Sequence, residues 1–386
     1  MEEMVSKKIK GYSPFITTCL FYLFRLARVK REKVVFCNYN GKGYGCNPKY
    51  IAEEMIRRNN GYDLVWLTLV DSNEFPKEIR RVDYHSIKAI YELATAGIWV
   101  DNQRKLPHYK KRKSQCFIET WHGGGGPIKK IGADNPRNIN NKPYEKTSRH
   151  MDKIVDVMVS NSKWCTKIYR SAFLYTGKIL EYGYPRNDIF FRPSLGIRHK
   201  VYDYFKIPDD YKIVLWAPTY RNGRDLDKYR LDLEKLIMNL NKKFNSYWTV
   251  LVRLHPTMEH KAKEMRYSKY IINASSYGDI HELLVASDVL ISDYSSVISE
   301  FALTGRPVFL YATDIKEYGI ERDFYMDYYS MPFPIAESND ELEQKISAYN
   351  EKKYKEDVLC YLDKVGMIEK GEASAKVVDY IESINT

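Results

Sequence analysis

The sequence has few cysteines, and none is spaced to pair with another. Its 386 residues include 6 cysteines, without a Cys-x-x-Cys pair or a Cys/His cluster. Several of them lie in apolar runs, where a thiol behaves as a small buried hydrophobe. This pattern argues against a disulfide scaffold. It predicts a reduced, cytoplasmic protein that has no structural metal and requires no cofactor.

The N-terminal apolar segment is too short to cross a membrane. Residues 13–33 (SPFITTCLFYLFRLARVKREK) contain an apolar stretch of about ten residues, whereas a spanning helix takes ~20. No small-residue cleavage site follows, so a signal peptide is not expected. Basic residues follow at once: Arg25, Arg28, Lys30, Arg31 and Lys33. Residues 1–33 are therefore either a basic amphipathic helix in an anionic membrane interface or a first helix packed on the protein body.

Acidic residues are outnumbered, with 50 Asp and Glu against 61 Lys and Arg and a net charge of +11. Such an excess favours nucleic acid, an acidic membrane surface or phosphate-rich substrates as partners. The run HYKKRKSQ at residues 108–115 is the best argument for a non-catalytic nucleic-acid or membrane-surface binder. No zinc, RNP or helix-turn-helix pattern accompanies this run, so nucleic acid is not expected as a partner.

No internal repeat or low-complexity linker interrupts the chain. Apolar runs alternate with helical patterns, which is typical of parallel strands buried on both faces. The expected strands are residues 34–39, 62–70, 97–102, 116–121, 155–162, 212–220, 248–256, 288–296 and 306–314. We therefore expect two Rossmann-like α/β domains, 34–190 and 191–360, with ligands in a cleft at the carboxyl ends of their strands. A C-terminal helix in 361–386 is expected to pack back on the first domain.

A glycine-rich turn follows one of the expected strands. Its sequence, TWHGGGGPIKKIG, matches neither a Walker A loop nor a GxGxxG fingerprint. Glycines remove side chains, so the N–H groups of Gly123 and Gly124 can touch an anionic ligand. His122 stands at the lip of this turn as a candidate general base, and Lys129 and Lys130 follow it as candidate phosphate ligands.

Two motifs further along the chain also suit phosphate. RLHP ends a strand with Arg253, whose fork matches phosphate oxygens, and His255, which is suited to a pyrophosphate or to proton transfer. SDYSSVISEF leads into a helix whose first turn carries Ser295 and Ser296. Glu300, a turn later, faces either a ribose hydroxyl or solvent. The plainer alternatives are a salt bridge for Arg253, a loop contact for His255 and an ordinary N-cap for the serines.

The motifs YGYPRND and WAPTYR flank the expected domain boundary. Each combines a proline-containing turn with an arginine that we expect to point into the cleft, although the glycine and proline also suit a simple hinge. The candidate donor-binding residues of these motifs are Pro218, Thr219 and Arg221, and the candidate acceptor- or phosphate-binding residues are Gly183, Arg186 and Asp188.

In order, the motifs TWHG…PIKKIG, NPKYIAE, GYPRND, APTYR, RLHP and SDYSSVISEFALTGRPVFLY resemble those of the CDP-glycerol glycerophosphotransferase family. That family comprises teichoic acid primases and polymerases and related capsule polymer transferases. The resemblance covers most of the chain, from about Val34 to the YATDIKEY segment. The family usually reads HGTPLKK where this sequence reads HGGGGPIKK.

The resemblance implies a GT-B fold, with an acceptor domain at 34–190 and a CDP-donor domain at 191–360. By position, His122 matches the catalytic histidine, and His255 matches a second histidine near the donor pyrophosphate. The donor-phosphate region is matched by Arg253, Ser295 and Ser296. The motifs around the cleft are matched by Gly183, Arg186, Pro218, Thr219 and Arg221.

The implied reaction transfers a polyol phosphate, glycerol phosphate first, from a CDP-polyol donor and releases CMP. The acceptor is a hydroxyl of a lipid-linked glycan or polyol-phosphate polymer, and CDP-ribitol is an alternative donor. We expect such a protein to lie peripherally on the inner face of the cell membrane. Two alternatives stay open: a GT-B glycosyltransferase that uses a nucleotide sugar, and the non-catalytic binder described above.

Overall fold

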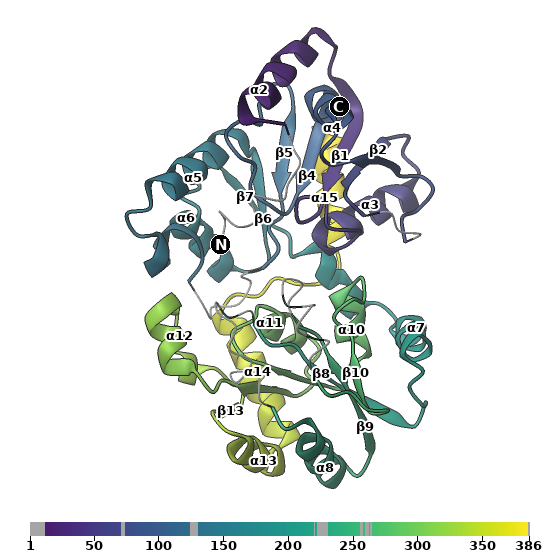
Figure 1. Ribbon diagram of the computed structural model, residues 1–386, viewed down its shortest axis with the longest axis vertical. Helices are drawn as coiled ribbons and strands as arrows, with labels where there is room; N and C mark the ends of the chain where they lie inside the picture. Colours follow the sequence, from purple (N-terminus) through teal and green to yellow (C-terminus); the bar gives the residue numbers. More distant parts are fainter. Residues whose placement is uncertain are drawn as a thin grey trace.

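The computed structural model describes residues 12–70, 74–123, 130–219, 221, 231–254, 258, 262 and 265–384. Two parallel sheets lie one above the other along the long axis of the molecule (Figure 1). We call the upper sheet with its helices the N-terminal half and the lower sheet with its helices the C-terminal half. Within the described residues, no helix is both long and apolar enough to span a bilayer.

The N-terminal half contains a seven-stranded parallel sheet in the order β3-β2-β1-β4-β5-β6-β7. Its strands are β1 (Lys30–Cys37), β2 (Asp63–Thr68), β3 (Arg80–Asp83), β4 (Ala96–Asp101), β5 (Cys116–Glu119), β6 (Val157–Ser160) and β7 (Lys178–Glu181). Its helices are α2 (Pro14–Leu23), α3 (Cys46–Arg58), α4 (Ile87–Thr95), α5 (Lys142–Ile154) and α6 (Lys163–Ala172).

The C-terminal half contains a six-stranded parallel sheet in the order β10-β9-β8-β11-β12-β13. Its strands are β8 (Tyr211–Trp216), β9 (Tyr247–Val252), β10 (Ile271–Asn273), β11 (Val289–Ser292), β12 (Val308–Tyr311) and β13 (Ile335–Ala336). Its helices are α7 (Leu195–Phe205), α8 (Leu233–Phe244), α10 (Ile280–Ala286), α11 (Val297–Ala302), α12 (Ile315–Arg322), α13 (Asn339–Ala348) and α14 (Glu351–Lys364).

The alternation of side chains along each strand explains the layers. In β1, Val34 and Phe36 pack on one face of the sheet with α3, whereas Val35 and Cys37 pack on the other face with α4 and α6. Because both faces are covered, the inner strands of each sheet contain continuous apolar runs. The expected parallel α/β architecture is confirmed.

A last helix, α15 (Ala373–Ser383), returns from the C-terminal half to the N-terminal sheet, where it appears in yellow beside α3 (Figure 1). Its Val377, Val378 and Ile381 are fully buried in the same cluster as Val34. Asp188 holds the start of this helix, because its carboxylate accepts hydrogen bonds from the backbone N–H groups of residues 373 and 374 at 2.9 and 2.8 Å.

The returning segment is fastened by the half-buried carboxyl of Glu369. Oε1 of Glu369 accepts hydrogen bonds from the backbone N–H of Tyr184 at 3.0 Å and from Nδ2 of Asn187 at 2.7 Å. Burial raises the pKa of Glu369 to about 8. Gly183 lies against this carboxyl with φ +91°, and a Cβ there would come within 2.5 Å of Oε2. The chain therefore needs a glycine at this position.

We expect Glu369→Gln to gain stability over the wild type as the pH rises from 5 to 8. Below the ordinary glutamate pKa, the folded and unfolded chains both hold the proton. Between that value and about 8 only the folded chain holds it, so stability falls by up to ~1.4 kcal/mol per pH unit. Urea unfolding of both proteins at pH 5 and pH 8 measures the difference. The exposed Glu372→Gln serves as the control, and an equal difference at both pH values would contradict the prediction.

Candidate active site

The strand ends of the two halves meet at Gly123 and Ser296. After β5 the chain runs through His122 to Gly123, and after β11 it runs through Ser295 and Ser296 into α11. A Cβ added to Gly123 would lie 3.3 Å from Oγ of Ser296. The structure therefore brings the histidine turn and the serine motif together, as expected of one site at facing carboxyl ends.

The ring of His122 is oriented by a backbone carbonyl. Nδ1 of His122 lies 2.5 Å from the carbonyl oxygen of Asn102, at the end of β4. A carbonyl only accepts, so Nδ1 carries the proton and Nε2 is the basic nitrogen of the neutral ring. The rings of Trp121 and Tyr39 pack against the imidazole at centroid distances of 4.1 and 4.9 Å. This arrangement fixes the tautomer that a general base needs.

The turn before the glycines has a strained backbone, and side chains from other parts of the fold hydrogen-bond to its carbonyls. Trp121 has φ +53°, a left-handed conformation that bulky residues rarely adopt. Nδ2 of the buried Asn47 donates to the carbonyls of Thr120 and Trp121 at 3.2 and 3.1 Å. Nη1 of Arg186 donates to the next carbonyl, that of His122, at 2.7 Å. Each carbonyl on this side of the turn is thus fixed by a side chain from elsewhere in the fold.

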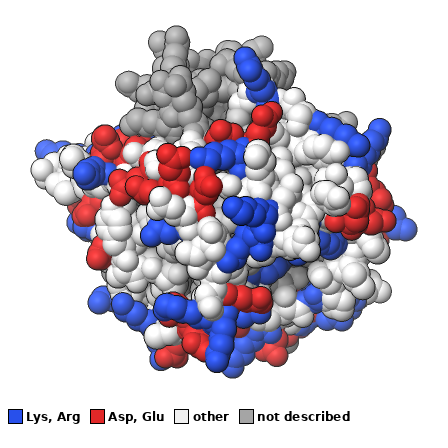
Figure 2. Space-filling model, turned by 90° about the horizontal axis from the view of Figure 1, so that it is seen from below, with Lys and Arg blue, Asp and Glu red and all other residues white. Residues whose placement is uncertain are grey.

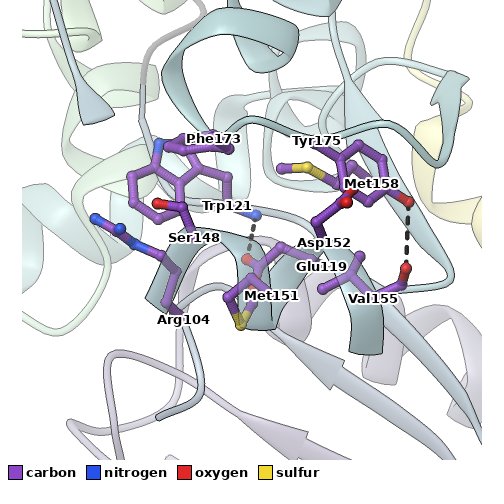
Figure 3. A pocket seen from close by; sticks show the side chains of 10 residues that line it. All are labelled: Arg104, Glu119, Trp121, Ser148, Met151, Asp152, Val155, Met158, Phe173 and Tyr175. Atoms are coloured by element: carbon purple, nitrogen blue, oxygen red, sulfur yellow. Dashed lines mark hydrogen bonds between the residues drawn. The ribbon is translucent and has the colours of Figure 1, made fainter. Parts of the chain in front are cut away.

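A small pocket beneath the turn contains a second support (Figure 3). Oε1 of Glu119 accepts a hydrogen bond from the backbone N–H of Trp121 at 2.9 Å. Burial, together with the nearby charge of Asp101, raises the pKa of Glu119 well above its usual value. The Trp121 ring packs on Phe173 at 4.6 Å. The strained residue is therefore held at both its backbone and its side chain.

Arg186 connects this turn to the C-terminal half. Its Nη2 lies 2.5 Å from Oε1 of Glu300 in α11, and the two side chains are 3% and 1% exposed. Oε2 of Glu300 lies 2.7 Å from Nε2 of His281. Burial opposes the charge on Glu300, but Arg186 and His281 outweigh it and lower its pKa. Glu300 is therefore ionised. Its carboxylate lies within 2.7 Å of Arg186 from the N-terminal half and of His281 from the C-terminal half.

Further contacts between the halves surround this pair. Lys49 of α3 lies 2.7 Å from Oδ2 of Asp279, next to α10. Lys130 pairs with Asp323 and lowers the pKa of that carboxyl. The Tyr325 hydroxyl accepts a hydrogen bond from the backbone N–H of Ile131 and donates one to the carbonyl of the same residue. The segment after the glycine turn is thus attached to the C-terminal half.

The other candidate residues of the C-terminal half lie in well-bonded positions. Arg221 is buried between Asp293 and Asp314, and the backbone N–H of Thr219 donates to Asp293 at 2.8 Å. Nη1 of Arg253 donates to the carbonyls of residues 274 and 277 at 2.9 and 2.5 Å. Pro218 follows β8, and Ser295 and Ser296 are half-buried. The expected roles of these residues in donor binding stay predictions.

Some expectations fall on positions that the structure does not describe. These are His255, Gly124 and Lys129, all of which lie outside the described residues. The alternative for Glu300, a side chain facing solvent, is wrong because this carboxylate is buried. Among the residues described, no group of His, Cys, Asp and Glu is arranged to hold a metal ion.

Sequence reasoning missed the residues that position His122. Asn47 lies in the motif NPKYIAE, Asn102 is the last residue of an expected strand, and His281 lies in α10. The signal for Asn102 was its place at the end of a central strand, where polar residues approach ligands. No feature of the sequence alone links His281 to Glu300.

Comparisons with known proteins agree with this arrangement. A family model described as CDP-Glycerol:Poly(glycerophosphate) glycerophosphotransferase matches residues 19–383. The teichoic acid poly(glycerol phosphate) polymerase of Bacillus spizizenii is 29% identical over 393 residues, which cover 97% of this chain and 99% of the relative. The Staphylococcus epidermidis protein of the same name is 30% identical over 373 residues, which cover 92% of this chain and 51% of the relative. The chain thus spans about half the length of the second relative.

A solved structure of the wall teichoic acid polymerase TagF shares the fold. It superposes with a TM-score of 0.83 at 28% identity, covering 100% of this chain and 95% of that chain. The expected GT-B-like arrangement of two Rossmann-like units is confirmed by this similarity. The central cleft stays a prediction.

Proposed function

Because this chain belongs to the CDP-glycerol:poly(glycerophosphate) glycerophosphotransferase family, we propose that it transfers a polyol phosphate from a CDP-activated donor to a polymeric or lipid-linked acceptor. Glycerol phosphate is the unit that the family description favours. The observation that carries the proposal is the contact of the His122–Gly123 turn with Ser296. This contact brings the candidate base His122, the glycine-rich turn and the serine motif into one site.

In the proposed reaction, the acceptor hydroxyl attacks the phosphorus that bears the polyol. A new P–O bond forms to the acceptor, the P–O bond to CMP breaks, and CMP leaves with the electron pair of that bond. Nε2 of His122 accepts the proton of the attacking hydroxyl. Phosphoryl transfer depends mostly on positioning and on neutralising charge on spread oxygens. Asn102, Asn47 and Arg186 provide the positioning of His122.

The donor side of the proposal uses the remaining motif residues. Arg253, His255, Ser295 and Ser296 are assigned to the donor pyrophosphate. Residues Pro218, Thr219 and Arg221 shape the loop after β8. The structure supports this assignment by placing Ser296 against Gly123 and Arg253 directly after β9.

A donor screen tests the proposed function. The purified protein is incubated with CDP-glycerol, CDP-ribitol, UDP-sugars and GDP-sugars together with a synthetic lipid-linked acceptor. We expect CMP release from a CDP-polyol and addition of one or more polyol phosphates to the acceptor by mass spectrometry. Release of UDP or GDP instead would establish a glycosyltransferase and overturn the proposal.

The contacts of the basic run at residues 108–115 argue against the alternative of a nucleic-acid binder. Nζ of Lys111 lies 2.8 Å from Asp156, and Arg112 donates to the carbonyls of residues 24 and 27 at 2.8 and 2.9 Å. These two cations hold the protein together. Figure 2 shows that Lys and Arg are interspersed with Asp and Glu over the described surface on the face seen there. The positive excess does not form a continuous track on this face.

We assign α2 and the short turn after it to the inner face of the membrane. Phe21 is buried against Trp99, so the helix does pack on the protein body. Its opposite side exposes Phe15 at 77% and Leu26 at 88% of their surface. The exposed Arg28, Lys30 and Arg31 follow directly, whereas Lys33 is buried in β1 and pairs with Glu92 at 2.6 Å. Both sequence interpretations therefore apply to the same helix: one side packs, and the other suits an anionic interface.

The double variant Phe15→Ser/Leu26→Ser should bind anionic vesicles at least tenfold more weakly than the wild type. Each of these side chains contributes about 1.5–3 kcal/mol to the free energy of membrane binding when it is transferred completely from water to the apolar part of the membrane. Cosedimentation with phosphatidylglycerol vesicles measures the loss. The control is Ile320→Ser, which removes an equally exposed apolar side chain from α12. Unchanged vesicle binding of the double variant would leave only the packing role of α2.

A further inference from the structure

Helix α5 forms one wall of a basic hollow in the N-terminal half. The hollow has a volume of about 450 Å³ and is lined by Pro107, Lys142, Glu145, Lys146, Arg149, His150 and Lys153. We call it the α5 groove. All its lining residues except Pro107 belong to α5, so a single helix supplies the charged surface.

Helical periodicity places the cations of the groove on one face. Lys142, Lys146, Arg149 and Lys153 follow one another at spacings of four, three and four residues, which align on one side of a helix. The opposite side of the same helix carries Ser148 and Met151. These two line the pocket beneath Trp121 (Figure 3). The helix therefore packs toward the histidine turn and presents its cations outward.

The charge of the groove is not neutralised from within. Among the described residues, the one carboxylate that lines the groove belongs to Glu145, and its Oε1 accepts hydrogen bonds from Nε and Nη2 of Arg149 at 2.9 and 2.7 Å. The side chains of Lys142, Lys146 and Lys153 make no hydrogen bond or ion pair to any described residue. The positive charge also affects the imidazole of His150. Burial, together with Lys110 and other nearby cationic groups, lowers the pKa of His150 to about 4. The groove thus carries a positive field that suits an anion.

Helix α5 is linked to the catalytic turn by Arg104, which lies on the side of the helix opposite to the groove. Its guanidinium carbon lies 4.2 Å from the ring centroid of Tyr144, in the first turn of α5, and 5.9 Å from that of Trp121. Trp121 directly precedes His122. Helix α5 thus carries a row of cations on its exposed side, while its opposite side contacts the residue before His122 through Tyr144 and Arg104.

A row of this kind fits a linear polyanion better than a single phosphate. At 1.5 Å per residue, the cations from Lys142 to Lys153 extend over about 16 Å. A single phosphate is bound by a compact nest of donors, whereas a phosphodiester chain presents charges at intervals. The family description names a poly(glycerophosphate) acceptor.

We propose that the α5 groove binds the phosphodiester chain of the polymeric acceptor, several units behind the hydroxyl that reacts at His122. This inference rests on the proposed function, because it assigns the groove to the acceptor of that reaction. The groove would hold a growing polymer through its backbone charges and would not contact a short acceptor.

The test compares short and long acceptors in the triple variant Lys142→Glu/Lys146→Glu/Lys153→Glu. All these side chains are exposed, so the fold should be retained. We expect the KM for an acceptor of many glycerol phosphate units to rise at least tenfold, with a weaker dependence on salt. The KM for a single-unit acceptor and for CDP-glycerol should stay within about twofold of the wild type. The matched control reverses Lys352, Lys353 and Lys355 on α14 and should leave all these values unchanged.

A direct binding measurement separates this inference from the proposed function. Purified poly(glycerol phosphate) is titrated into wild-type and triple-variant protein without donor. Weaker binding by the variant supports the groove even if no CMP is released from any donor, in which case only the reaction is wrong. Equal binding, or an equal loss of activity with short and long acceptors, would overturn the inference. So would a variant that loses vesicle or DNA binding but keeps its KM for the long acceptor.

Discussion

Replacing His122 with Ala should slow CMP release from CDP-glycerol by about 10²–10⁴-fold, which is the usual contribution of a general base. The ring is held by the carbonyl of Asn102 in the tautomer whose Nε2 is basic. Its loss removes the group to which we assign the acceptance of the hydroxyl proton. Steady-state assays of CMP release with a synthetic acceptor measure the effect, and calorimetric titration with CDP-glycerol measures donor binding in the same variant.

The control for this prediction is His199→Ala, which removes an exposed histidine from α7. It should retain wild-type turnover. A His122→Ala protein with turnover within a few-fold of the wild type would remove His122 as the base. A variant that has lost donor affinity, while the turnover of bound donor persists, would instead assign His122 to binding.

Arg186→Lys should lower kcat by about 10–100-fold with little change in the KM for CDP-glycerol. A lysine retains the charge, but it cannot reach Glu300 and the carbonyl of His122 with separate donors as the guanidinium does. The turn would then shift, and a displacement of about 1 Å at a reacting group can cost 10²-fold. Turnover and donor KM measured together separate this positioning role from the substrate-binding role expected from the sequence, which predicts a raised KM.

The stability of the Arg186 variants gives a second readout. Arg186→Ala leaves Glu300 buried without its guanidinium, which typically costs 3–5 kcal/mol. Urea unfolding measures this cost. The control for the kcat of Arg186→Lys is Arg198→Lys, because Arg198 pairs with Asp288 entirely within the C-terminal half. An Arg186→Lys enzyme with wild-type kcat would contradict the coupling of the two halves to His122.

Much of the fold could be predicted from the apolar runs, and the strands that were missed share a physical reason. β3, β7, β10 and β13 are the outermost strands of their sheets. An edge strand has a neighbour on one side only and is partly exposed. β3, for example, buries only one of its residues. Such a strand lacks the continuous Val, Ile and Leu run that marks a central strand.

The candidate site was predictable where its residues follow strands. His122, Gly123 and Ser296 come together because parallel strands direct the segments after their carboxyl ends to one edge of each sheet. The bonding of individual side chains was not predictable. Arg186 and Glu300 are separated by more than a hundred residues, and their pairing depends on how the halves dock. Asp188 caps the last helix for the same kind of reason.

The return of α15 to the first sheet has a consequence for biosynthesis. Val377, Val378 and Ile381 fill the cluster that covers one face of the N-terminal sheet. While a ribosome is still translating the C-terminal half, only α3 covers that face, and the apolar side chains that α15 will bury meet water or a chaperone. The half that carries His122 is therefore completed only when residue 383 has left the exit tunnel, and the first part made is among the last to mature.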